Sequence, residues 1–123
     1  TYYKAGGTTT ATNLRRFDMP ASNRLRYTGT PDIHVHFASN FSMTTTGTSD
    51  VIGVKLALNG VVIDGSTVRR KVGTGADVGS ASCHWDLTMS TNDYIELFVT
   101  NEDAAGTDVT LQNGYMFAMG MLM

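Results

Sequence analysis

The sequence predicts an all-β domain, an antiparallel sandwich of about eight to ten strands. Apolar residues recur with a period of two in short runs, and turn signals separate these runs at intervals of about eight to twelve residues. Nowhere do apolar residues repeat with the spacing of an amphipathic helix over three turns. A chain of 123 residues is long enough for a single packed core, so we expect one domain.

The first clear alternation spans residues 33–43, "IHVHFASNFSM". The predicted core face holds Ile33, Val35, Phe37, Phe41 and Met43, and the opposite face holds His34, His36, Ala38 and Asn40. The run 51–63, "VIGVKLALNGVVI", places Ile52, Val54, Leu56 and Leu58 on the core side. Successive strand residues point to opposite faces, so each run predicts a strand with one buried side.

Turn signals and charge define the middle of the chain. Asn59-Gly60 favours a two-residue hairpin turn because both residues tolerate positive φ, and Asp64-Gly65 repeats the signal. Residues 68–72, "VRRKV", predict a polar edge strand, since basic side chains discourage pairing with another chain. Residues 73–80, "GTGADVGS", predict a loop.

Alternation resumes in the last third of the chain. Cys83, Trp85, Leu87 and Met89 are expected inward, as are Ile95, Leu97 and Val99 of the next run. Residues 108–112 predict a short strand, Asn113-Gly114 a tight turn, and residues 115–123 a final strand.

The final run, "YMFAMGMLM", is apolar on both of its alternating faces. We expect Tyr115, Phe117, Met119 and Met121 in the core. A sandwich strand buries only one face within its own domain, so the other face needs a second partner. We therefore predict a subunit interface; its residues are Met116, Ala118 and Leu122, together with Tyr94 and Phe98 from the outer face of the preceding run.

Residues 1–16 are Gly-rich and weakly patterned, which predicts an N-terminal arm preceding a domain at 17–123. Tyr2 and Tyr3 could anchor this arm on a neighbour, and a frayed terminus is the alternative. Arg15 and Arg16 are candidate partner contacts. The net charge of −2 gives no basis for binding nucleic acid. No run is long enough to span a membrane, and no signal segment is recognised, so we expect a soluble chain.

Candidate chemistry is sparse. His34, His36 and His84 could form a zinc site of three nitrogens, but histidines on a strand face are more often surface or interface residues, so no metal or cofactor is predicted. Ser82, His84 and Asp86 alternate on one strand face about 7 Å apart, which is not the spacing of a hydrogen-bonded triad. The single Cys83 lies at a core position. We expect no enzyme.

Four segments carry a resemblance to a known family: "NRLRYTG" leading into "IHVHFASNFSM", then "VKLALNGVVIDGS", "LTMSTNDYIELFVTN" and "GYMFAMGML". Over about residues 17–123 the chain resembles the jelly-roll domain of the C1q and tumour-necrosis-factor families and of small tailed-phage structural proteins. The resemblance implies a jelly roll that forms homotrimers through its closing strands. Asn92-Asp93 departs from the usual Gly-Asp of the family, and no collagen-like or coiled-coil stalk precedes the domain.

We therefore expect a virion structural protein, a trimeric capsid decoration or cement protein on the outer surface of a phage head. Its partners would be two further copies and the major capsid protein, with Tyr2, Tyr3, Arg15 and Arg16 as capsid contacts. The alternative is a receptor- or glycan-binding knob of a phage tail or head fibre. An extracellular C1q-like ligand fits less well, because the stalk is missing.

Overall fold

The protein is described by a computed structural model that covers residues 2–47, 49–73, 77–103 and 108–122, without the side chain of Leu122. It is all-β with antiparallel sheets, as the sequence predicts. The strands are β1 Tyr3–Lys4, β2 Phe17–Asp18, β3 Arg24–Tyr27, β4 Ile33–Thr45, β5 Asp50–Leu58, β6 Val61–Val62, β7 Val68–Val72, β8 Gly79–Met89, β9 Tyr94–Asn101 and β10 Val109–Leu122, with one 3-10 turn, η1, at Asp64–Ser66.

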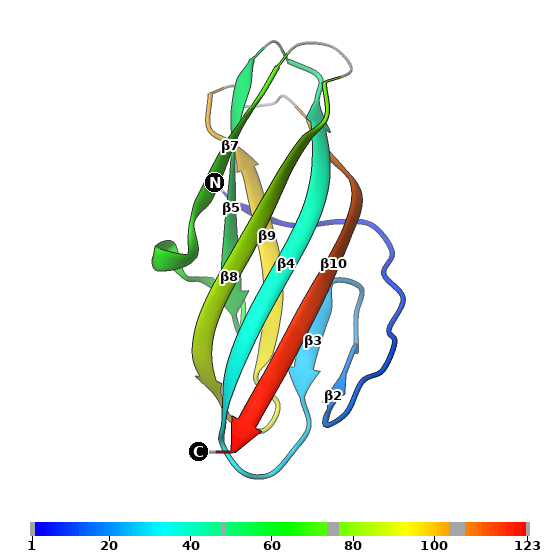
Figure 1. Cartoon of the computed structure of the whole chain (residues 1–123), viewed down its shortest axis with the longest axis vertical. Coiled ribbons are helices and arrows are strands. Elements are labelled where there is room, and N and C mark those ends of the chain that lie inside the picture. The colour runs from blue at the N-terminus through cyan, green and yellow to red at the C-terminus, as the bar shows by residue number, and fades with distance from the viewer. Residues whose placement is uncertain (1, 48, 74–76, 104–107, 123) are drawn as a thin grey trace.

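Two sheets face each other to form a β-sandwich. Sheet A has the order β2-β3-β9-β5-β6, with β1 paired to β9 and β7 paired to β5. Sheet B has the order β10-β4-β8, and Figure 1 shows these three long strands side by side in front of sheet A. Along the described chain, strand β10 is therefore one edge of the smaller sheet.

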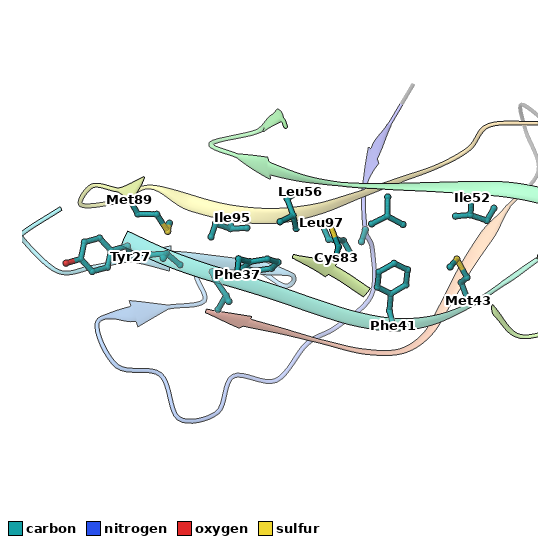
Figure 2. Close-up of a cluster of buried hydrophobic side chains, with 14 of the residues drawn as sticks. Tyr27, Phe37, Phe41, Met43, Ile52, Leu56, Cys83, Met89, Ile95 and Leu97 are labelled. Carbon is teal, nitrogen blue, oxygen red and sulfur yellow. The ribbon is translucent and has the colours of Figure 1, made fainter. Parts of the chain in front are cut away.

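The core lies between the sheets and comes from the predicted alternating faces (Figure 2). The inward positions of β4, β5, β8 and β9 are all buried or packed against the core, which confirms those four predicted faces. Tyr27 is also fully buried, and its hydroxyl donates a 2.6 Å hydrogen bond to the carbonyl oxygen of Pro31. That bond satisfies the polar end of an otherwise apolar side chain.

The predicted hairpin turn is confirmed, because Asn59 and Gly60 have φ of 53° and 82° and join β5 to β6. Asp64-Gly65 forms the 3-10 turn η1 instead of a second hairpin turn. The Ser66 hydroxyl accepts from the Leu56 N–H at 2.9 Å and so ties this turn to β5. Strand β7 pairs only with β5 in the described chain, as expected for an edge strand.

The structure differs from the prediction at the end of the chain, where β10 is one continuous strand. Residues 108–112 and 115–123 are not separate strands joined by a turn at Asn113-Gly114, because Val109–Leu122 pairs with β4 throughout. Leu111 pairs with Met43 and Asn113 with the adjacent Ser42, so Gln112 is the extra residue of a β-bulge. Inward positions are odd-numbered before the bulge and even-numbered after it.

The predicted N-terminal arm begins inside the sheet. Tyr3 pairs with Val99 through β1, and Ala5 is buried in the core. The Asn23 side-chain amide, itself buried, donates to the carbonyl oxygens of residues 5, 6 and 7. The first part of the arm is thus held by its own domain, and the blue trace in Figure 1 then runs along the side of β3 and β10.

Candidate assembly surface

Four large side chains of β10 form an exposed apolar stripe on the outer face of sheet B. These are Tyr115, Phe117, Met119 and Met121, with exposed fractions of 60, 43, 55 and 62%. The sequence placed these four residues in the core, and that prediction is wrong. The strand does have two apolar faces as predicted, but the larger residues lie on the outside.

Space on the inner face explains this reversal. A Cβ added at Gly114 would lie 2.9 Å from both the Asn40 carbonyl oxygen and Phe41 Cβ. A Cβ at Gly120 would lie 2.7 Å from Ile33 Cδ1. Side chains of β4 fill the space beneath β10, so only small or flexible residues fit there.

Two predicted interface residues are therefore corrected. Met116 and Ala118 are partly buried against the core instead of facing a neighbour. Leu122 pairs with Ile33 through the backbone, and its side chain lies outside the described residues.

Tyr94 and Phe98 do not join the stripe, because β9 belongs to sheet A and β10 to sheet B. They lie on the outer face of sheet A and are half-buried. The Arg24 guanidinium covers the Tyr94 ring at 4.2 Å from its centroid, and Phe98 is flanked in the register by Lys4 and Lys55. A contiguous patch of Tyr94, Phe98 and β10 is thus excluded.

Apart from Ala38, which lies beside Phe117, the neighbouring strand β4 is polar on the outer face of sheet B. Moving from β10 to β4, Tyr115 lies beside Asn40, Met119 beside His36, and Met121 beside His34. The Asn40 amide donates to the Tyr115 hydroxyl at 3.4 Å. The apolar stripe therefore follows the edge of the sheet and gives way to polar side chains toward its middle.

The free edge of β10 adds to the exposed surface. The strand contains no charged residue and no proline, the usual devices that keep an edge from pairing with another chain. Residues 5–12 of the arm face its first half across an open cavity of about 600 Å³, which Leu111 to Met116 also line. In the described chain, β10 pairs only with β4, which lies on the other side of the strand from this edge.

The four predicted capsid contacts lie in two separate places. Tyr3 is 67% exposed beside β9, and the neighbouring Tyr2 hydroxyl donates to Glu102 at 3.2 Å. Burial, and then the Glu102 carboxylate, raises the pKa of Tyr2. Arg15 and Arg16 are exposed at the other end, where they line a small cavity with Met121. Only the two arginines therefore adjoin the stripe.

Residues considered for chemistry have other partners. Asp86 accepts from His36 Nδ1 at 2.8 Å, and Ser82 donates to Asn40, so neither contacts His84 as a triad would require. Burial raises the pKa of the Cys83 thiol to about 11, which leaves it protonated and unreactive at neutral pH. Cys83 is thus a core residue, as predicted.

Among the residues that the structure describes, no helix is long and apolar enough to cross a membrane. No known family model matches the sequence, and no curated protein is significantly similar to it.

Proposed function

We propose that this protein is a virion structural protein, a homotrimeric capsid decoration or cement protein that assembles through the β10 stripe. The observation that carries the proposal is the exposure of Tyr115, Phe117, Met119 and Met121 along a sheet edge with which no described strand pairs. Burying one such side chain completely is worth about 1.5–3 kcal/mol. Four neighbouring side chains therefore provide a strong driving force for association.

The strand order supports a jelly roll of the kind that forms such trimers. Consecutive strands pass back and forth between the sheets: β3 lies in sheet A, β4 in sheet B, β5 to β7 in sheet A, β8 in sheet B, β9 in sheet A and β10 in sheet B. Jelly rolls are double-sheet folds of this type. The resemblance implies that the closing strand lies at a threefold axis, and the stripe is on the closing strand of this chain, which supports the proposal.

Binding to a shell would follow from multivalency. A trimer presents three copies of Arg15 and Arg16 beside the three stripes, and three weak contacts on one rigid body gain effective concentration at a capsomer junction. The exposed Tyr3 supplies a second contact on each copy. This arrangement stabilises a capsid from its outer surface without any one strong contact.

Analytical ultracentrifugation of the full chain tests the assembly step. We expect a trimer at low micromolar concentration, and Phe117→Asp should weaken association by 100-fold or more, roughly the worth of 3 kcal/mol. Val61→Asp is the matched control, because Val61 is 69% exposed on β6, in the other sheet. A monomeric wild-type protein, or equal effects of the two variants, would contradict the proposed interface.

The capsid step needs a separate experiment. Purified protein is incubated with undecorated phage heads and with host cells, and bound protein is measured after sedimentation. Binding to heads, reduced by the double change Arg15→Ser and Arg16→Ser, is the expected result. Binding to cells alone would reject the cement role and favour a fibre knob.

A further inference from the structure

Two histidine side chains converge on the outer face of sheet B, on the strands next to the apolar stripe. His36 Nε2 of β4 and His84 Nδ1 of β8 are 3.3 Å apart, and the two ring centroids are separated by 5.4 Å. In the register, His84 pairs with Ala38, one step along the same face from His36. The pair is therefore a diagonal cross-strand contact between neighbouring strands.

This separation matches the bite of a metal chelate. Two nitrogen ligands at about 2.0–2.1 Å from a tetrahedral Zn²⁺ ion are about 3.3 Å apart. As a hydrogen bond, this contact is at the long end of the range, and both nitrogens can exchange it for a metal ion. Both rings are on the solvent side of the sheet, so small rotations can direct both lone pairs at one ion.

Asp86 supplies the outer support that metal-binding histidines need. Its Oδ1 lies 2.8 Å from His36 Nδ1, on the far side of the ring from His84. A carboxylate in this position accepts the Nδ1 proton, which leaves Nε2 as the free lone pair and fixes the ring. The three side chains thus lie in a row: the Asp86 carboxylate, the oriented His36 imidazole and the His84 imidazole.

We propose that His36 Nε2 and His84 Nδ1 chelate one divalent transition-metal ion of the Zn²⁺ class, with Asp86 as the orienting carboxylate. Imidazole nitrogen suits Zn²⁺, Cu²⁺ and Ni²⁺. No group of three or more His, Cys, Asp or Glu side chains is arranged for metal in the described residues, so water completes the shell. The site goes beyond the assembly role and uses different strands from the stripe.

The register also provides a control. His34 lies on the same face of β4 as His36, but it pairs with Thr88, two steps along β8 from His84. Successive residues on one strand face are about 7 Å apart, so His34 is about 14 Å along the sheet from His84. The three-nitrogen site considered from the sequence is therefore not formed. Replacing His34 should affect only nonspecific metal binding, which makes His34→Gln the control variant.

Isothermal titration of the full chain with Zn²⁺ at neutral pH tests the site. We expect one ion per chain with a Kd in the micromolar range, abolished by either His36→Gln or His84→Gln. His34→Gln should bind like the wild type, and Asp86→Asn should bind about 10–100-fold more weakly because the ring loses its orientation. Binding should also weaken in mild acid, since protons compete for the imidazoles.

Co²⁺ provides an independent readout, because its visible absorption reports histidine coordination directly. The wild type and His34→Gln should give the same spectrum, and His36→Gln should give only the weak spectrum of aqueous Co²⁺. Absence of Zn²⁺ binding at millimolar concentration would overturn the proposal, as would an equal loss in His34→Gln and His36→Gln. Metal binding is measured by titration and by the Co²⁺ spectrum, and assembly by sedimentation, so the site and the assembly role fail separately.

Discussion

The two outer faces of the sandwich differ in whether charged side chains cover their aromatic and apolar residues. On sheet A, Glu96 is only 2% exposed and is held by Lys4 Nζ at 2.9 Å and Arg24 Nε at 3.0 Å. The same Arg24 covers Tyr94. On sheet B, the four residues of the apolar stripe have no charged side chain on their own strand to cover them.

This contrast separates a face whose apolar residues are covered by basic side chains from a face whose apolar residues lie exposed. Long basic side chains shield apolar surface with their stems and keep their charges hydrated, which allows sheet A to end in solvent. The β10 stripe has no charged residue on its own strand, and Arg15 and Arg16 adjoin it only beside Met121. The difference supports assembly through sheet B, and changes to each face should have different consequences.

The largest effect is expected from deleting Phe117, which would shift the end of β10 by one residue and exchange its faces. Met119 and Met121 would then be driven into the positions of Ala118 and Gly120, and at position 120 an added Cβ would lie only 2.7 Å from Ile33 Cδ1. Each overpacked site costs about 1–3 kcal/mol, so we expect a loss of several kcal/mol in urea unfolding.

Deleting Gln112 is the matched control for this experiment. Leu111 and Asn113 already pair with the adjacent residues Met43 and Ser42, so removing Gln112 yields a regular strand with the same faces. We expect a change below about 1 kcal/mol. Equal destabilisation by the two deletions would show that the bulge does not set the faces of β10.

The bulge also shows where prediction from the sequence stopped. The alternation in β4, β5, β8 and β9 could be predicted, because burial on one side alone imposes a period of two. Asn113-Gly114 reads as a hairpin turn in isolation, and Asn59-Gly60 forms one. The difference is the partner strand: β4 is long enough to pair with all of β10, and no local signal contains that information.

The candidate assembly surface was partly predictable for a related reason. Two apolar faces on the last strand could be recognised, but which face is inward depends on the space left by Ile33 and Phe41 of another strand. Likewise, the outward direction of Tyr94 and Phe98 could be predicted. The sequence does not indicate that their strand, β9, belongs to the opposite sheet from β10. Such properties depend on contacts distant in the sequence.

A moderate effect is expected from Glu96→Gln, which removes the buried negative charge that Lys4 and Arg24 bind on sheet A. Lys4 and Arg24 would lose their partner, although both side chains are about one-third exposed and can regain water. Hydrogen bonds to charged groups contribute about 1.5–3 kcal/mol, so we expect a loss near or below the lower value in urea unfolding. Assembly should be unchanged, and a Glu96→Gln protein that dissociates would contradict the division of roles between the faces.

The smallest effect concerns the exposed pair of Arg69 and Glu102 at the edge of sheet A. The hydrogen bond from Arg69 Nε, 2.7 Å to Oε2, lowers the pKa of Glu102 below its ordinary 4.5. A lowered folded-state pKa stabilises the fold above the unfolded value, and this contribution is lost as the pH falls through the folded value. Arg69→Met should therefore lower the urea midpoint slightly at pH 7 and converge with the wild type in strong acid. Because the pair is exposed, salt should reduce the difference at neutral pH, and a difference that grew in acid would contradict this assignment.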